Sequence, residues 1–407
     1  MDDSRRWLML GLGTAAQTAA STLMFGLPFL LPALRREQGL SLAQAGALAA
    51  APSVGLVLTL ILWGVLADRY GERAVLATGL TLTGAVALAS TAAVEPAARG
   101  TMFALIGAAG ASVNAASGRL VMGWFGVRQR GVAMGVRQMG QPLGVAAAAL
   151  VMPPLAQAHG IGAALAVPAL ACLVVALLIA VLARDPAPAH ATATAGSAAA
   201  RPPASPYRRP TLWRVHAASS MLVVPQFATA TFSAEYLVSS RGWSGSDAGR
   251  VLAVVALLGA FGRLGAGHWS DLVGSRLRPM RQVALLSALT MVLVGVAVHA
   301  QSWLVLVALA VASVVSVADN GLGFTATAEL AGRAWSGRAL GVQNTAQNLA
   351  AFATGPVVGA LAGAQGFAVA FAACAFFPLL GAWATPVRAE HRDAPASAPH
   401  GAGVSEA

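Results

Sequence analysis

Twelve apolar stretches, each near the length that spans a bilayer, follow one another along this chain and constrain its fold more than any other feature. They lie at 7–31, 43–65, 74–94, 100–123, 132–156, 161–183, 213–238, 247–268, 281–300, 303–328, 340–362 and 366–387. A helix of about 20 mostly apolar residues crosses the hydrocarbon core of a membrane. The pattern predicts an all-α membrane protein with twelve transmembrane helices.

The overall composition excludes a water-soluble globule. Hydrophobic residues make up 57% of the chain and charged residues only 10%, whereas soluble domains carry about 25% charged residues. All 26 basic residues are arginine, and the net charge is +11. A positive charge of this size is compatible with either nucleic acid or a membrane surface as the partner.

The placement of the arginines decides between these partners. If the apolar stretches are spans, eighteen arginines fall on one side of the membrane, and three lie inside spans: Arg119, Arg137 and Arg263. The opposite side carries only Arg35, Arg36, Arg99, Arg241 and Arg250. Arginine gathers on the cytoplasmic side of membrane proteins. We therefore expect a multi-pass protein of the cytoplasmic (inner) membrane, with both termini cytoplasmic and no nucleic-acid partner.

A proline-rich segment divides the chain into two halves. Between Arg184 and Pro210 the composition shifts to Ala, Pro, Ser and Arg, which prevents a continuous helix. We predict an N-terminal six-helix bundle at 1–183, a cytoplasmic linker at 184–212 and a C-terminal six-helix bundle at 213–387. The polar segment at 388–407 is predicted to be a disordered cytoplasmic tail.

The two halves are tandem copies of one unit. Residues 131–143 match residues 337–349 at six positions, with an offset of 206 residues. At the same offset, Asn114 in the fourth span corresponds to Asn320 in the tenth. Internal repeats of this kind predict two pseudo-symmetric six-helix bundles.

A charged turn between the second and third spans is repeated between the eighth and ninth. The first copy reads Gly64-Val65-Leu66-Ala67-Asp68-Arg69-Tyr70-Gly71-Glu72-Arg73, and the second reads Gly267-His268-Trp269-Ser270-Asp271-Leu272-Val273-Gly274-Ser275-Arg276. Gly64 is expected to permit close helix contact, and Gly71 a tight turn. The motif resembles the signature loop G-x-L-A-D-R-x-G-x-R of the major facilitator superfamily. The second copy departs from it, since Leu272 replaces the arginine found at Arg69.

The resemblance implies a secondary transporter whose halves rock about a central site lined by spans one, four, seven and ten. It also implies gating roles for Gly64, Asp68, Arg69, Gly71, Arg73, Gly267, Asp271, Gly274 and Arg276. In the superfamily the loop aspartate contacts the opposite half when the cytoplasmic side is closed. We therefore expect Asp68 to pair with Arg338, and Asp271, by symmetry, with Arg130.

Ionisable and amide side chains within the spans are the candidate site residues. An ionisable group at a span centre costs about 2.5–3.5 kcal/mol on insertion scales, so it requires a partner, water or a function. The candidates for substrate binding are Arg263, Arg137, Gln141, Asn114, Asn320, Gln343 and Asn344. His216 is a weaker candidate. The competing interpretation is that the neutral polar groups only hold helices together.

The position of Arg263 suggests the type of substrate. It lies eight residues before Asp271, which resembles the arginine of span eight in monocarboxylate and oxalate/formate transporters. This implies a small organic anion. The monocarboxylate carriers place an aspartate one turn before the arginine, where this chain has Gly259. Coupling to a proton would therefore use Glu235 or Asp319, the remaining deep acids.

We expect a secondary active transporter that moves a small organic anion by alternating access, through proton coupling or exchange with a counter-substrate. The first alternative is proton-driven efflux of hydrophobic compounds, and the second is a non-transporting membrane sensor. No nucleophile-base or metal-ligand cluster is evident, so neither an enzyme nor a cofactor is expected. Cys172 and Cys374 are interpreted as small packing residues. The expected partners are the substrate, the proton or counter-substrate and the bilayer, and the protein is expected to be a monomer.

Overall fold

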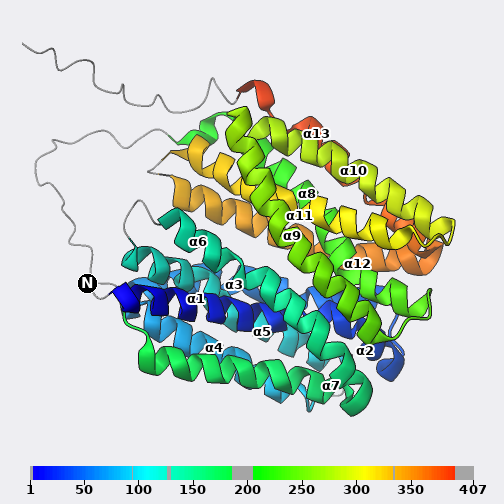
Figure 1. The fold of residues 1–407 in the computed structure, drawn as a ribbon, viewed down its shortest axis with the longest axis horizontal. Coiled ribbons are helices and arrows are strands. Elements are labelled where there is room, and N and C mark those ends of the chain that lie inside the picture. The colour runs from blue at the N-terminus through cyan, green and yellow to red at the C-terminus, as the bar shows by residue number, and fades with distance from the viewer. Residues whose placement is uncertain (1–2, 94, 126–129, 186–204, 333–334, 390–407) are drawn as a thin grey trace, which may run out of the picture.

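The computed structural model describes residues 3–93, 95–125, 130–185, 205–332 and 335–389, and the regular elements in these ranges are all helices (Figure 1). The first half contains α1 (Asp3–Met24), the 3-10 helix η1 (Leu27–Leu30), α2 (Leu31–Gln38), α3 (Leu42–Tyr70), α4 (Glu72–Ser90), α5 (Pro96–Trp124), α6 (Arg130–Gln138) and α7 (Gly140–Leu182). The second half contains η2 (Pro206–Arg208), α8 (Pro210–Ser239), α9 (Gly245–Val273), α10 (Leu277–His299), α11 (Val305–Ala331), α12 (Ser336–Ala373), α13 (Phe376–Ala384) and η3 (Val387–Ala389).

Two of the helices are too long for a single membrane crossing. The 43 residues of α7 would extend about 65 Å as one helix, against a hydrocarbon core of about 30 Å. Each long helix contains one glycine with a positive φ: Gly160 in α7 at 81°, and Gly366 in α12 at 83°. These glycines lie 206 residues apart, so the repeat extends to the backbone. With two spans each in α7 and α12, the fold is consistent with the twelve expected helices.

The two halves lie side by side and meet at one end (Figure 1). α1 begins at the opposite end, where the halves diverge and where the segments that border the linker also lie. We call this end the linker end, and the end where the halves meet the sealed end. α3 and α9 both begin at the sealed end, because each follows a helix that started at the linker end.

Close backbone contacts hold the sealed end together. A methyl group added to Gly46 of α3 would lie 2.3 Å from the carbonyl oxygen of Gly355 of α12. One added to Gly249 of α9 would lie 2.0 Å from the carbonyl oxygen of Ala149 of α7. Any side chain at these glycines would force the helices apart, so glycine is what allows the halves to meet here.

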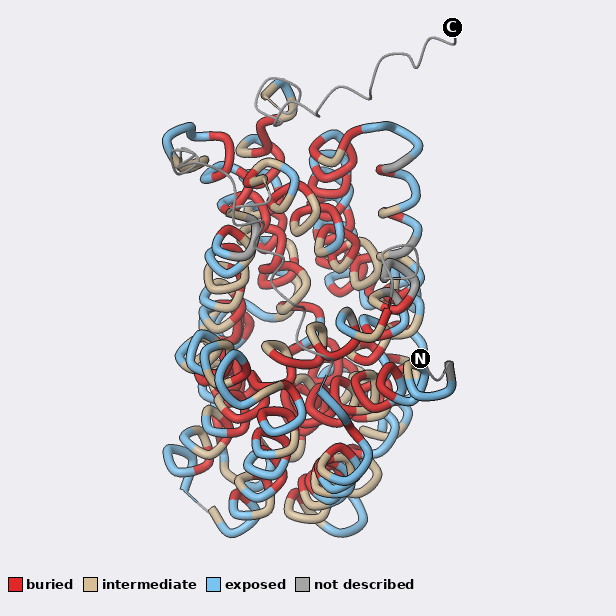
Figure 2. Tube along the Cα trace, turned by 90° about the vertical axis from the view of Figure 1, so that its left-hand side faces the viewer, coloured by how far each residue is buried: buried red, intermediate tan, exposed pale blue. Residues whose placement is uncertain are grey.

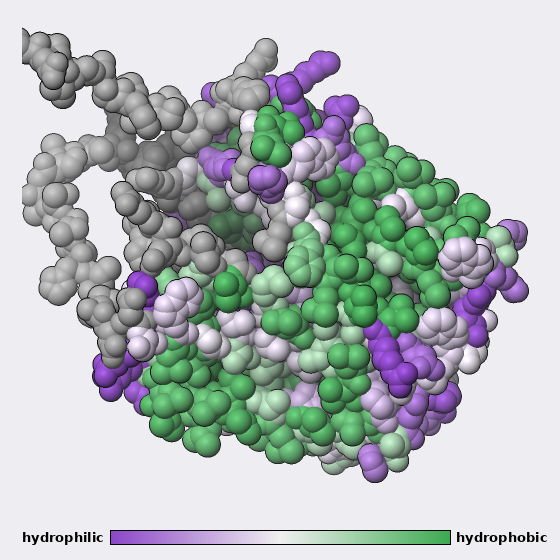
Figure 3. Space-filling model, in the orientation of Figure 1, coloured by the Kyte–Doolittle hydropathy of each residue, from purple (hydrophilic) through white to green (hydrophobic). Residues whose placement is uncertain are grey.

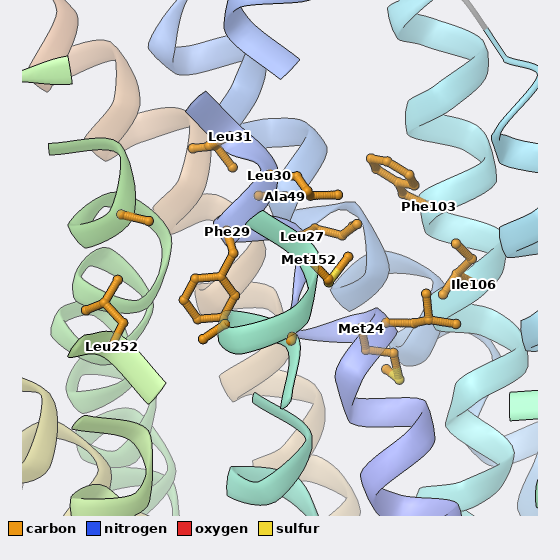
Figure 4. Close-up of a cluster of buried hydrophobic side chains, with 14 of the residues drawn as sticks. Met24, Leu27, Phe29, Leu30, Leu31, Ala49, Phe103, Ile106, Met152 and Leu252 are labelled. Carbon is orange, nitrogen blue, oxygen red and sulfur yellow. The ribbon is translucent and has the colours of Figure 1, made fainter. Parts of the chain in front are cut away.

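The first span is broken near the sealed end. η1 and α2 continue from α1, and Pro28 and Pro32 each lack the amide hydrogen that a continuous helix would use. Figure 4 shows that the break carries a buried apolar cluster that includes Phe29, Met152 and Leu252. The cluster draws on α7 of the first half and α9 of the second, so it lies at the junction of the two halves.

The outer surface of the protein is apolar across its middle. Figure 3 shows a broad hydrophobic area between hydrophilic ends, and Figure 2 shows buried residues inside the bundles and exposed ones around them. Ile61 is 78% exposed and Leu177 is 64% exposed. Large apolar side chains on the outside and small residues at helix contacts are the arrangement expected of a protein embedded in lipid.

Candidate functional site

A cavity of about 540 Å³ lies between the two halves and extends from their middle toward the linker end. We call it the central cavity. It is lined by six of the expected substrate-binding residues: Asn114, Arg137, Gln141, Arg263, Asn320 and Asn344. The seventh, Gln343, is fully buried and lies outside this lining. Residues separated by more than 200 positions therefore share one polar site.

Arg137 of α6 is held in the cavity wall by neutral groups. Its guanidinium donates to Ser117 Oγ at 2.8 and 3.0 Å and to Gln17 Oε1 at 3.0 Å. It also donates to Gln138 Oε1 at 2.8 Å. The side chain is 7% exposed. These bonds fix its geometry but do not balance its charge, so Arg137 gives the cavity wall a positive potential.

Arg263 of α9 is the less satisfied of the two arginines. Among the described residues, its Nη1 donates to Gln141 Oε1 at 3.5 Å, and its Nε has no hydrogen-bond partner. Within the part of the chain that the structure describes, no carboxylate pairs with this guanidinium. The Arg263 side chain is half-buried, and a guanidinium does not lose its proton in a protein, so it retains the capacity to bind an anion.

Two corresponding amide pairs line the central cavity, one in each half. Gln17 of α1 donates to Asn114 of α5 at 3.5 Å, and Asn320 of α11 donates to Gln226 of α8 at 3.1 Å. One amide pair thus links spans one and four, and another links spans seven and ten, with the glutamine as donor in the first half and the asparagine as donor in the second. Sequence reasoning missed Gln226, although its position relative to Asn320 resembles that of Gln17 relative to Asn114.

A smaller cavity of about 140 Å³ adjoins the central cavity on its sealed side. We call it the apolar chamber. Its walls include Met24, Phe25, Phe29, Ala49 and Leu252, of which Figure 4 labels all but Phe25 around the break in span one. The sequence did not predict it, because its walls come from both halves.

Asp319 lies in neither cavity lining but inside the second half. It is 1% exposed, and neither of its carboxylate oxygens has a hydrogen-bond partner among the described residues. A methyl group built on Gly323 would lie 2.3 Å from Ser219 Oγ, 3.1 Å from Gln343 Nε2 and 3.6 Å from Asp319 Oδ2. The carboxylate therefore borders a buried polar cluster.

That cluster continues toward the linker end through His216. Gln343 Oε1 is 3.0 Å from His216 Nδ1, and His216 Nε2 is 3.1 Å from the hydroxyl of Tyr207. Gln343 also accepts from Thr327 and donates to Ser219 at 3.2 Å. Gln343 and His216 thus form part of a hydrogen-bonded chain within the second half rather than of the cavity surface.

Glu235, the other acid considered for proton coupling, forms an ion pair with Arg35 of α2. The pair joins the two halves at the sealed end. The carboxylate is 1% exposed, and its second oxygen has no hydrogen-bond partner in the described structure. Glu235 therefore contributes to the contact between the halves in this conformation.

The signature loop is held within the first half. Gly71 has a φ of 84°, and the carboxylate of Asp185 accepts from the backbone N–H of Arg73 at 2.7 Å. Asp68 pairs with Arg119, one of the three arginines that lie inside the predicted spans. Tyr70 contacts Arg69, whose guanidinium carbon lies 5.3 Å from the ring centroid. The tight turn at Gly71 is observed as expected.

The second loop also turns at a glycine with a positive φ, although it is longer, with three residues between α9 and α10 where Gly71 alone separates α3 from α4. Gly274 has a φ of 64°, and Arg276 pairs with Glu329 at 3.2 Å. A methyl group built on Gly64 or Gly267 would meet no described atom within 4 Å. The close helix contact expected at Gly64 is therefore not made in this conformation, because the halves diverge at the linker end.

The latch contact expected between Asp68 and Arg338 is not made between the described residues in this conformation. Asp68 pairs with Arg119 rather than Arg338, whose guanidinium carbon lies 4.9 Å from the ring centroid of Trp335. The side chains of Asp271 and Arg130 lie outside the described residues, as do the tail at 390–407 and most of the linker. The latch remains a prediction for a conformation in which the linker end is closed.

Comparison with known proteins gives a consistent family assignment. The family model of the Major Facilitator Superfamily matches residues 12–355. Two uncharacterised MFS-type transporters from strains of Mycobacterium tuberculosis are each 42% identical over 384 residues, which cover 94% of this chain and 85% of theirs.

The fold is also found in solved transporter structures. A bacterial homologue of the human lysosomal transporter Spinster, in an inward-facing and occupied conformation, has a TM-score of 0.81 and 15% identity, covering 97% of this chain and 98% of that one. A mutant of the nucleoside transporter NupG has a TM-score of 0.73 and 14% identity, covering 92% of this chain and 98% of its own. At these identities the likeness concerns the fold.

Proposed function

This chain belongs to the major facilitator superfamily, which makes it a secondary transporter rather than an enzyme, and we propose that its substrate is a small organic anion. The anion would bind in the central cavity between Arg263 and Arg137. Alternating access would then expose the cavity first at one end of the protein and next at the other.

The observation that carries this proposal is the unpaired guanidinium of Arg263. It faces a cavity of about 540 Å³, and no described carboxylate balances its charge. A carboxylate substrate would accept two parallel charge-assisted hydrogen bonds from the guanidinium and would balance its charge. The charge of Arg137 also attracts the anion. Its donors already bind neutral groups, so it does not replace Arg263 as the hydrogen-bonding partner of the carboxylate.

The proposal is tested by binding small carboxylates, amino acids, sugars and hydrophobic cations to the purified protein and measuring its thermal stability. Carboxylates are expected to raise the melting temperature. In Arg263→Lys the charge remains but the forked geometry is lost, so carboxylate affinity is expected to fall about tenfold or more. Arg250→Lys, an exposed change on the same helix, is the control. Stabilisation by neutral or cationic compounds alone contradicts the proposal.

For energy coupling, we propose that Asp319 binds the transported proton. Its carboxylate is buried without a described partner and borders the hydrogen-bonded chain through Gln343 and His216. A carboxylic acid in such a setting can be protonated without losing an ion pair. Glu235 is less suited to this role in the present conformation, since it is engaged by Arg35. Exchange against a counter-substrate is the competing mode.

The apolar chamber favours a second candidate function, the proton-driven efflux of hydrophobic compounds. It provides apolar walls directly beside the central cavity. A neutral hydrophobic substrate would, however, leave Arg263 without an anionic partner. We therefore favour transport of an organic anion over efflux of hydrophobic compounds.

We further propose that the linker end is cytoplasmic and that the structure represents an inward-facing state in the cytoplasmic membrane. The support is the excess of arginine on the linker side and the tight contacts at the sealed end.

A further inference from the structure

The central cavity and the apolar chamber meet at Arg263. Six residues line both spaces: Phe25, Gln141, Gln226, Phe227, Ala260 and Arg263. An anion held by the guanidinium would therefore border the chamber on its sealed side. Any group attached to that anion can enter the chamber without leaving the site.

Five hydroxyl residues line the chamber, namely Ser53, Thr229, Thr231, Ser313 and Ser316, and two of them donate to carbonyl groups of their own helices. Thr229 Oγ1 donates to the carbonyl oxygen of Pro225 at 2.9 Å, and Ser316 Oγ donates to that of Ser313 at 3.1 Å. What remains facing the space is mostly hydrocarbon and aromatic surface. Such walls favour an apolar group, because the transfer of apolar surface from water to apolar surroundings is favourable.

The volume of the chamber limits the size of that group. Its volume is about 140 Å³, and an apolar cavity of about 150 Å³ is known to accommodate a benzene ring. The chamber therefore fits about six carbon atoms, as a ring or a short chain. Beyond it the sealed end leaves no room, because Gly46 and Gly355 bring the helices into contact.

We infer that the substrate is an amphipathic carboxylate, with its charged group at Arg263 and an apolar group of about six carbons in the apolar chamber. The inference rests on the proposed function and narrows it. A small polar anion would leave the chamber unfilled, and a neutral hydrophobic molecule would leave Arg263 unpaired. One molecule with both parts satisfies both features.

Calorimetric titration of the purified protein with acetate, butyrate, hexanoate, octanoate and benzoate tests the inference. Each methylene that enters the chamber is expected to tighten binding about fourfold. The gain should end at about six apolar carbons, so that octanoate exceeds hexanoate by no more than the one methylene that still fits. Hexanamide, which has the chain but not the charge, should bind at least about tenfold more weakly than hexanoate.

Two variants fill the chamber without touching the charged group. Ala230 and Ala256 line the chamber but not the central cavity. Ala230→Leu should remove the advantage of hexanoate and benzoate over acetate while leaving acetate affinity unchanged. Ala256→Leu reaches the same space from another helix and serves if the first variant does not fold. Ala217→Leu, at an exposed position of α8 that lines neither cavity, should change nothing.

The outcomes separate the inference from the proposed function. If carboxylates bind through Arg263 with an affinity independent of chain length, or if Ala230→Leu weakens acetate as much as hexanoate, the chamber has no role and only the inference is overturned. If hexanamide binds as tightly as hexanoate, or if no carboxylate binds at all, both are overturned.

Discussion

Arg35 of α2 and Glu235 of α8 form an ion pair between the two halves at the sealed end, with the carboxylate 1% exposed and the guanidinium 29% exposed. The pair cannot persist when the halves separate there. It therefore stabilises one conformation of the transport cycle relative to the other, and a change at either residue should move the balance between them.

Glu235→Gln is expected to shift the equilibrium toward opening at the sealed end by about tenfold, the effect of about 1.4 kcal/mol. The shift can be measured in intact cells as the reactivity of Ser53→Cys, in the apolar chamber, toward an impermeant thiol reagent. Asp247→Asn removes an exposed pair with Arg250 at the same end and should have no effect. Equal reactivity in Glu235→Gln and the parent protein would contradict a gating role.

Gly355→Ala should also shift the equilibrium toward opening at the sealed end, in this case through a steric clash. The added methyl would lie 2.3 Å from the carbonyl oxygen of Gly46, so the helices must move apart. Gly363→Ala on the same helix meets no described atom within 4 Å and should be neutral or stabilising by up to about 1 kcal/mol. The two variants are compared by the thiol reactivity of Ser53→Cys and by melting temperature. The interpretation fails if both variants behave alike.

Asp319→Asn is expected to abolish accumulation driven by a pH gradient while preserving exchange. With a gradient of one pH unit, coupling to one proton allows about tenfold accumulation, and the variant should approach none. Uptake into proteoliposomes with and without the gradient measures this, and Asp247→Asn provides an exposed carboxylate as control. If Asp319→Asn still accumulates substrate in response to the pH gradient, the transported proton binds at another residue.

Asp68→Asn should slow transport about tenfold, as a loss of about 1.4 kcal/mol from the closed linker end would predict. Its present pair with Arg119 is largely exposed, so the melting temperature should change little. Substrate affinity should stay within the error of calorimetry. Parallel loss of affinity and of stability would indicate misfolding instead of a missing latch.

A cysteine at Ser205, in the linker segment, should remain unlabelled by an impermeant reagent applied to intact cells. The excess of arginine on this side predicts a cytoplasmic location. Labelling after permeabilisation shows that the cysteine is accessible. Labelling without it would reverse the proposed topology.

Sequence alone predicted the features that depend on repetition and on burial within one span. Apolar stretches and the 206-residue offset indicated the paired bundles, and the offset recurs at Gly160 and Gly366. A charge inside a span requires a partner, water or a function, which makes Arg137 and Arg263 candidate site residues, and both line the central cavity. These inferences require only the local sequence and the thickness of a membrane.

Features that depend on contacts between halves were not predictable in this way. The pairing of Arg35 with Glu235 joins residues 200 positions apart, and helix periodicity does not specify which faces meet. Gln343 lies one helical turn before Gln347, which lines the central cavity, yet it contacts His216 inside the second half. The apolar chamber needs walls from both halves, so it exists only once they have docked.

The contact between Gly46 and Gly355 has a consequence for leakage. Backbone atoms in contact gain only about 0.1–0.2 kcal/mol per atom pair, and a gap of 0.5–1 Å already forfeits a quarter to a half of that. Cohesion across such a contact has a very short range. A small separation therefore already loses a large share of this attraction, so the contact favours a fully closed seal over a slightly open one. A state slightly open to both compartments, which would dissipate the ion gradients of the cell, is stabilised less by this contact than the closed state.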